Sequence, residues 1–104
     1  MSGHATVFVV DDDEALRDSV RVLLDSVGLA SEGYASAGAF LAAYRDVPGC
    51  VLLDVRMPGM SGLRMQEELA ARGIRTPIVF MTGHGDVPMA VEAMKKGALD
   101  FIEK

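Results

Sequence analysis

The sequence predicts an α/β fold built on an open, parallel sheet of five strands. Short apolar runs alternate along the chain with segments whose hydrophobic residues recur at helical spacing. Strands that are separated by helices pair in parallel through right-handed crossovers. The four apolar residues from Cys50 to Leu53 indicate a central strand that is buried on both faces.

The first half of the chain is expected to form two strands and two helices. The first strand covers Thr6–Val10, and the following helix ends at Gly28. The stripe of this helix comprises Leu16, Val20, Leu23, Leu24 and Val27. Each side chain contributes about 1.5–3 kcal/mol when buried, so the stripe should anchor the helix. An edge strand is expected over residues 29–34, and a second helix begins at Ser36. The anchors of that helix are Phe40, Leu41 and Tyr44.

The second half should add two helices and two strands after the central strand. Ser61 starts a third helix, which Gly73 closes, with Leu63, Leu69 and Ala70 facing inward. The fourth strand is expected over residues 77–81 and the fifth over residues 98–102. The helix between them, over residues 86–96, should bury one face made of Val87, Ala90, Val91 and Met94.

Polar side chains follow four of the five expected strands. They are Asp11 and Asp12, Asp54, Thr82, and Lys104. Ligands of parallel sheets bind outside the carboxyl ends of the strands, where these residues would meet. Each residue has a plainer explanation alone, as a helix cap, a loop hydroxyl or a solvated charge, but four such coincidences at one edge favour a site.

The acidic residues predict a bound cation if the first and central strands are neighbours. Two unit charges about 4 Å apart repel by roughly 4 kcal/mol at an effective dielectric constant near 20. Carboxylate oxygens suit Mg²⁺, whereas the chain offers no set of Cys and His ligands for zinc.

These motifs together resemble the receiver domain of two-component response regulators. The resemblance rests on the Asp11-Asp12 pair, the run from Asp54 through Met57-Pro58 to Gly62, Thr82-Gly83 and Lys104, and it extends from residue 6 to residue 104. Residues 82–104 are most similar to the nitrogen-fixation regulator branch, whose members carry a helix-turn-helix output domain. The family implies a flavodoxin-like sheet in the order 2-1-3-4-5, which places the first strand beside the third.

The resemblance implies a phosphoacceptor that catalyses its own phosphorylation and dephosphorylation and is not a conventional enzyme. A sensor histidine kinase would transfer a phosphoryl group from its phosphohistidine to Asp54. Asp12 and Asp54 would hold Mg²⁺, for which Mn²⁺ can substitute, with Asp11 acting through water and Arg56 through its backbone carbonyl. Thr82 and Lys104 would contact the phosphoryl group, together with the backbone N–H groups of Arg56 and Gly83.

The same resemblance implies a switch and a control of its lifetime. Thr82 and Phe101 would be the switch residues, although the residues alone favour Phe101 as a core aromatic. The surface formed by the fourth helix and fifth strand would support a homodimer. Arg56 and His84 would flank the hydrolytic water and tune the lifetime of the phosphoryl group; the alternative for His84 is a solvated loop residue. Asp13 and Glu14 fit better as helix-start charges than as ligands.

Composition limits the class of protein. The chain has 104 residues, a net charge of −5 and a pI of about 4.8, which argues against nucleic-acid binding by this segment itself. We therefore expect DNA contacts, and transcription regulation, through an output domain. No apolar run approaches the roughly 20 residues of a membrane span. One cysteine cannot form an internal disulfide, which suits the cytoplasm.

Two alternatives and one departure from the family pattern remain. A phosphorylation-independent pseudo-receiver would also have this fold, but such modules usually lack an acidic ligand, the acceptor or the lysine. An aspartyl phosphatase would need Asp-x-Asp, and here Asp54 is followed by Val55 and Arg56. Receiver domains usually continue with a fifth helix beyond the lysine. Residues 1–104 are therefore expected to be a receiver domain that is incomplete at its C-terminus, unless a partner or second copy covers that face.

Overall fold

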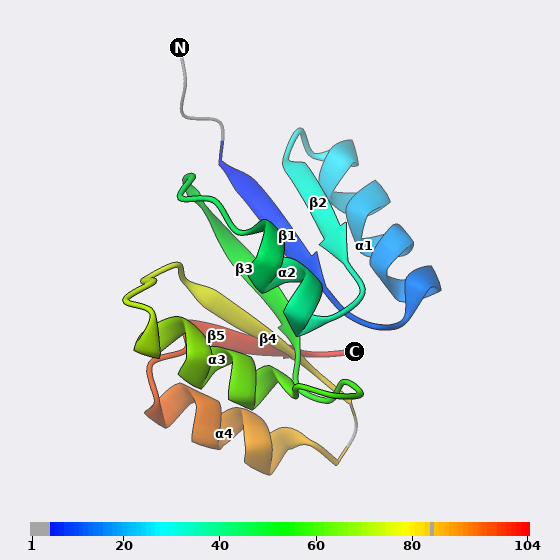
Figure 1. Ribbon diagram of the computed structural model, residues 1–104. Helices are drawn as coiled ribbons and strands as arrows, with labels where there is room; N and C mark the ends of the chain where they lie inside the picture. Colours follow the sequence, from blue (N-terminus) through cyan, green and yellow to red (C-terminus); the bar gives the residue numbers. More distant parts are fainter. Residues whose placement is uncertain (1–4, 84) are drawn as a thin grey trace.

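The computed structural model describes residues 5–83 and 85–104. In this part of the chain, five parallel strands form one sheet in the order β2-β1-β3-β4-β5, and four helices connect them (Figure 1). The elements are β1 (Thr6–Val10), α1 (Glu14–Ser26), β2 (Ala30–Tyr34), α2 (Ala37–Ala43), β3 (Gly49–Asp54), α3 (Gly62–Ala71), β4 (Ile78–Thr82), α4 (Val87–Lys95) and β5 (Asp100–Glu103). The predicted fold class and strand order are confirmed.

The register of the sheet brings the ends of the strands to one edge. Val10 lies opposite Leu53 in the β1–β3 pair, and Asp54 lies opposite Met81 in the β3–β4 pair. Thr82 lies opposite Glu103 in the β4–β5 pair. The residues that end or follow β1, β3, β4 and β5 are therefore held side by side by the sheet.

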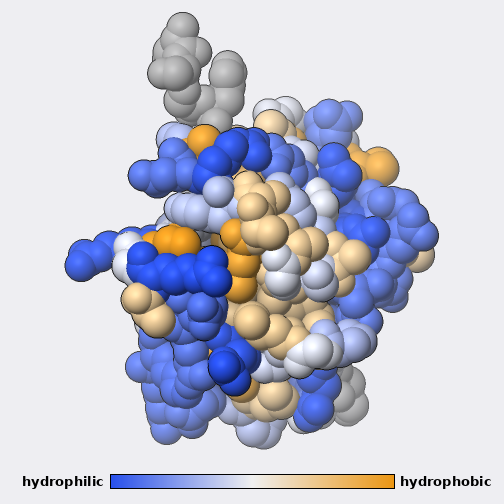
Figure 2. All heavy atoms as spheres, in the orientation of Figure 1, coloured by the Kyte–Doolittle hydropathy of each residue, from blue (hydrophilic) through white to orange (hydrophobic). Residues whose placement is uncertain are grey.

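Helices cover the two faces of the sheet unequally. The larger core lies under α2, α3 and α4, and it includes Phe8, Val10, Val51, Leu53 and Phe80. In Figure 1, α2 and α3 lie in front of the strands and α4 lies below α3. The opposite face carries a smaller cluster of Val7, Val9 and Met81, against which Val20 and Leu24 of α1 pack. In the space-filling view of the first face, hydrophobic residues gather near the centre and hydrophilic residues cover the margins (Figure 2).

The predicted stripe of α1 is only partly correct. Val20 and Leu24 pack against the smaller cluster, but Leu23 and Val27 are 64% and 66% exposed, and no residue of α1 is fully buried. The helix lies against β1 and β2 at one side of the sheet, so the stripe is wider than the surface it contacts. On the same face, Cys50 and Leu52 are half-buried, so the expectation that β3 is buried on both faces holds for one face only.

Two predicted inward residues of the other helices are also exposed. In α3 the buried residues are Gly62, Met65, Gln66 and Leu69, whereas Ala70 lies outside the buried face. Successive residues of a helix are about 100° apart, so the residue after Leu69 points away from the sheet. In α4 the small residues Ala90 and Ala93 face the sheet, and Val91 is exposed.

Three helices begin at a residue that caps them with its side chain. Asp13, Ser36 and Ser61 accept hydrogen bonds from the backbone N–H groups of Leu16, Ala39 and Arg64. Such caps satisfy N–H groups that have no partner within the helix. The predicted starts at Ser36 and Ser61, and the assignment of Asp13 to the helix start, are confirmed. Within the described ranges, no helix combines the length and the apolar character needed to cross a lipid bilayer.

Gly62, the first residue of α3, lies directly against the backbone of Asp54. Its N–H donates to the carbonyl of Val55 at 2.9 Å, and a Cβ at this position would lie 2.1 Å from the carbonyl oxygen of Asp54. The obstacle is backbone, so no side chain can move aside. Only glycine lets α3 start this close to the end of β3.

We predict that Gly62→Ala lowers the free energy of unfolding by roughly 1–3 kcal/mol, because the added methyl group forces the backbone apart. Chemical denaturation measures the change. Gly38→Ala is the matched control: its Cβ would meet nothing closer than Ser36 Oγ at 4.0 Å, and it should stabilise α2 by about 0.5–1 kcal/mol. Equal effects of the two substitutions on the free energy of unfolding would contradict the prediction that the backbone contact at Gly62 excludes a side chain.

Candidate functional site

Three carboxylates converge at the carboxyl edge of the sheet. Asp11 and Asp12 follow β1 and Asp54 ends β3, and one side-chain oxygen from each lies within 4.8 Å of the others. Asp11 and Asp54 are only 0% and 6% exposed, whereas Asp12 is exposed. The sequence prediction that these residues meet is confirmed.

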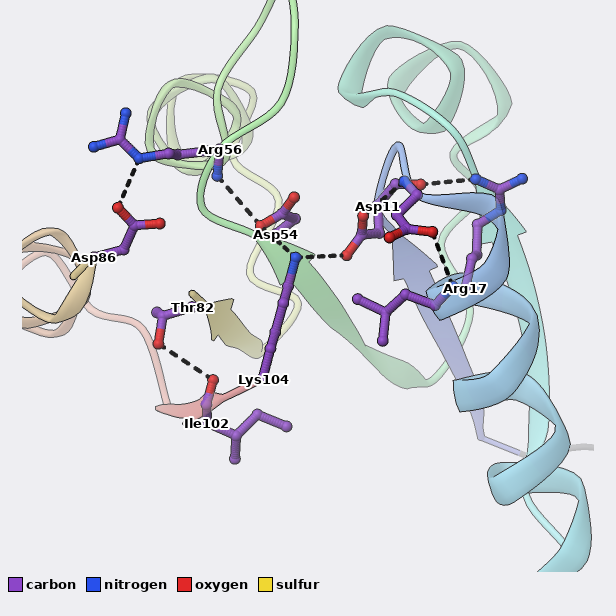
Figure 3. A network of polar contacts seen from close by, with 10 residues as sticks. Asp11, Arg17, Asp54, Arg56, Thr82, Asp86, Ile102 and Lys104 are labelled. Carbon is purple, nitrogen blue, oxygen red and sulfur yellow. Dashed lines mark hydrogen bonds and ion pairs between the residues drawn. The ribbon is translucent and has the colours of Figure 1, made fainter. Parts of the chain in front are cut away.

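Lys104 lies between the two buried carboxylates. Its Nζ is 3.1 Å from Asp11 Oδ2 and 3.1 Å from Asp54 Oδ1 (Figure 3). Lys104 follows β5, and its backbone N–H donates to the carbonyl of Thr82 at 2.8 Å. The sheet therefore fixes the backbone of the lysine, and its long side chain carries the charge to the acids.

Local backbone contacts hold the acids in place. Asp11 Oδ1 accepts from the N–H of Asp13 at 2.9 Å, and the carbonyl of Asp11 accepts from Arg17 Nη1 at 2.8 Å. Asp54 Oδ1 accepts a longer bond, of 3.4 Å, from the N–H of Arg56. The sequence did not predict the contact of Arg17, which lies in the first turn of α1, with the carbonyl of Asp11. Only the six-residue spacing between the two residues could have indicated it.

The donor set fits Mg²⁺ or Mn²⁺. Among the described residues, the buried Asp11 Oδ2 accepts no well-directed hydrogen bond, although it is close to Lys104. A buried carboxylate oxygen in this state can still take a cation. The exposed carboxylate of Asp12 adds a further oxygen ligand toward solvent, where a hydrated ion can enter. Asp11, Asp12 and Asp54 are thus the residues that would hold the ion, and the carbonyl of Arg56 stays a prediction.

The environment shifts the pKa values of two groups. Burial raises the pKa of Asp54, and the charge of Asp11 adds to this effect, while Lys104 and the N–H of Arg56 oppose it. Burial by itself would lower the pKa of Lys104, but its contacts with Asp11 and Asp54 outweigh burial and raise that pKa. Lys104 is therefore a cation at neutral pH, and it only partly offsets the cost of ionising Asp54.

Thr82 and Phe101 lie on neighbouring strands. Thr82, the last residue of β4, is fully buried, and its Oγ1 donates a long bond of 3.4 Å to the carbonyl of Ile102. Phe101 is half-buried and packs against the larger core, which matches its interpretation as a core aromatic. Among the described residues, the Thr82 hydroxyl is hydrogen-bonded to Ile102 and makes no hydrogen bond to Asp54.

Arg56 points away from the acids toward the start of α4. Its Nε lies 2.6 Å from Asp86 Oδ1 (Figure 3). Sequence reasoning missed this partner, because Asp86 followed by Pro88 indicates only that a helix begins there. Gly83 lies between Thr82 and this helix, and the predicted role of His84 falls outside the described residues.

We predict that Asp54→Asn stabilises the metal-free protein at pH 7. A pKa that is raised in the folded state means that folding favours the protonated carboxyl, so ionisation costs stability once the pH rises above the unfolded pKa, near 3.8. Asparagine stays neutral at every pH. Its advantage should shrink as the pH falls toward the unfolded value.

Denaturation in EDTA across pH 4–7 measures this difference. A less stable Asp54→Asn protein at pH 7 would mean that the loss of the Lys104 contact outweighs the relief from burying a charge, which would contradict the prediction.

Comparison with known proteins identifies the family. The family model described as "Response regulator receiver domain" matches residues 7–104. The chain is 57% identical over 101 residues to the transcriptional regulatory protein FixJ of Azorhizobium caulinodans, covering 94% of this chain and 47% of the relative. It is 48% identical over 106 aligned positions to the response regulator protein TodT of Pseudomonas putida, covering 100% of this chain and 47% of that relative.

A solved structure agrees with these relatives. Full-length FixJ from B. japonicum superposes with a TM-score of 0.90 at 49% identity, over 99% of this chain and 51% of that one. The chain therefore spans about half the length of the curated relatives it matches. The family model matches nearly all of the residues, the sheet has the order 2-1-3-4-5, and Lys104 lies between Asp11 and Asp54 at one edge of it. This chain therefore belongs to the response regulator receiver domain family.

Proposed function

We propose that Asp54 accepts a phosphoryl group from the phosphohistidine of a sensor histidine kinase, in a reaction that requires Mg²⁺. The observation that carries this proposal is the Lys104 ammonium between Asp54 and Asp11, at the end of a buried strand. It places a positive charge, carried on a flexible side chain, beside a carboxylate that also lies close to Asp11 and Asp12. A transferred phosphoryl group needs this combination of a nucleophile and a charge clamp.

Asp54 is the nucleophile of the proposed step. A carboxylate oxygen attacks phosphorus, a P–O bond forms, and the P–N bond to the imidazole of the donor breaks. The electron pair of that bond stays on the imidazole nitrogen, so no external oxidant or other reactant is needed. Because burial opposes ionisation of Asp54, moving negative charge from its oxygen toward the phosphoryl group offsets part of that cost.

The surrounding groups stabilise the charge of the phosphoryl oxygens. Lys104 provides a mobile cation within reach, and the N–H groups of Arg56 and Gly83 and the hydroxyl of Thr82 provide further donors. When bound to Asp11, Asp12 and Asp54, Mg²⁺ would supply positive charge that offsets the repulsion between carboxylate and phosphoryl oxygens. The N–H of Arg56, which already points at Asp54 Oδ1, supports this assignment.

Thr82 is the proposed start of the switch. Its hydroxyl now donates only a long bond to the carbonyl of Ile102, and a phosphoryl oxygen is a stronger acceptor. Turning Thr82 toward Asp54 would free space beside β5 into which Phe101 can turn. The surface of α4 and β5, where Val91, Leu99 and Ile102 are exposed, would then change and form a homodimer.

The output is proposed to be DNA binding by a domain joined to this one, in the cytoplasm. FixJ relatives are named transcriptional regulatory proteins, and they are about twice as long as this chain. The net charge of −5 supports keeping DNA contacts away from this domain. Arg56 and His84 are proposed to tune the lifetime of the phosphoryl group.

Phosphorylation by acetyl phosphate, followed by intact mass spectrometry, tests the proposal. We expect one phosphoryl adduct on the wild type in Mg²⁺, none in EDTA, and none on Asp54→Asn, because the nucleophile and its cation are both required. Asp25→Asn, which removes an exposed carboxylate from α1, is the control and should retain the adduct. A folded protein that takes no phosphoryl group would instead support the pseudo-receiver alternative.

Mg²⁺ should also stabilise the fold without any phosphoryl donor. A ligand of the folded state that is present at 100 times its dissociation constant adds about 2.7 kcal/mol to the free energy of unfolding. Asp12→Asn should lose most of this gain, whereas Asp18→Asn, an equal charge change on the exposed side of α1, should keep it. Denaturation with and without Mg²⁺ measures both effects, and an equal gain in the two variants would contradict the assignment of Asp12.

A further inference from the structure

The ion pair between Arg56 and Asp86 joins the two loops that flank the acceptor. Arg56 lies two residues after Asp54, and its backbone N–H points at Asp54 Oδ1 at 3.4 Å. Its side chain points in the other direction, with Nε 2.6 Å from Asp86 Oδ1 (Figure 3). One residue thus touches the acceptor through its backbone and the start of α4 through its guanidinium.

Asp86 does not serve its own helix as the other capping residues do. Asp13, Ser36 and Ser61 have extended backbones and cap their helices with their side chains. Asp86 holds the same position in α4, but its φ and ψ are −98° and 6°, and its side chain makes no capping bond. Its carboxylate contacts Arg56 instead, so helix capping does not explain the aspartate.

We propose that Asp86 is a positioning residue that acts through Arg56: it holds the guanidinium away from Asp54, and a phosphoryl group on Asp54 competes with Asp86 for it. This inference rests on the proposed function. A phosphoryl group carries more negative charge than a carboxylate and offers three acceptor oxygens, which suit the planar guanidinium. The Arg56 side chain is 68% exposed and that of Asp86 is 16% exposed, and an ion pair whose cation lies largely in water is weak enough to exchange its partner.

The exchange would reach the first turn of α4. The carbonyl of Asp86 accepts from the N–H groups of Met89 and Ala90, and the N–H of Asp86 donates to the carbonyl of Gly83. Asp86 therefore connects the loop after Thr82 to the start of the helix, while its side chain ties both to Arg56. Losing that tie loosens the start of α4 from the loop after β3, on the side of the molecule that carries Asp54.

The binding of beryllofluoride, a non-covalent phosphoryl mimic, tests the inference. Calorimetric titration with Mg²⁺ compares the wild type, Asp86→Asn, Arg56→Gln and the double variant. Asp86→Asn should bind the mimic about two- to fivefold more tightly, the range that one exposed ion pair supports, because Arg56 no longer has to leave a partner. In the Arg56→Gln background, the same change at Asp86 should have no effect.

Glu92→Gln is the matched control, since it removes one negative charge from the exposed side of the same helix and should leave the affinity unchanged. Weaker binding by Asp86→Asn would show a merely structural role and overturn the inference. An equal gain in the Arg56→Gln background or with Glu92→Gln would also overturn it, as a general charge effect. A wild type that binds no mimic would refute the proposed function, and this inference with it.

Discussion

The Lys104 ammonium makes it possible to bury two carboxylates at the end of this sheet. Asp11 and Asp54 are almost completely shielded from water, and two unpaired charges in such a place would be costly. The lysine follows β5, and β4 lies between β5 and β3. Because neighbouring strands are about 4.8 Å apart, β5 and β3 are about 10 Å apart, and only a long side chain can reach from one to the other. The strand order and the charge balance of the site therefore depend on each other.

The acids and the lysine could be predicted because they lie at the ends of apolar runs. In a parallel sheet all strands run in the same direction, so the residue after each strand arrives at the same edge whatever the helices do. Asp11, Asp54 and Lys104 needed only the strand order to be placed together. The helix starts at Ser36 and Ser61 were equally accessible, since capping depends on the few residues that follow.

The remaining errors concern contacts that local sequence does not determine. Leu23 and Val27 fit the helical period as well as Leu24 does, yet only the position of α1 on the sheet decides which of them is covered. The partners of Arg17 and Arg56 were missed for a related reason. A long flexible side chain can reach many places, and Asp86 is 30 residues from Arg56 along the chain. The shift in the pKa of Asp54 likewise depends on burial, which no motif reports.

The close approach of Gly62 to Asp54 has a consequence for protein engineering. The loop between β3 and α3 could be lengthened beside its exposed tip, where nothing lies within 4 Å of a Cβ added to Gly59, although Gly59 itself has a φ of +76° and should stay glycine. The end of that loop cannot be varied in the same way, because the backbone of Gly62 packs directly against the backbone of Asp54 and so fixes where α3 starts. A redesigned version of this domain must therefore keep Gly62 and its contact with the Asp54 backbone, and its substitutions or insertions belong in the loop before α3.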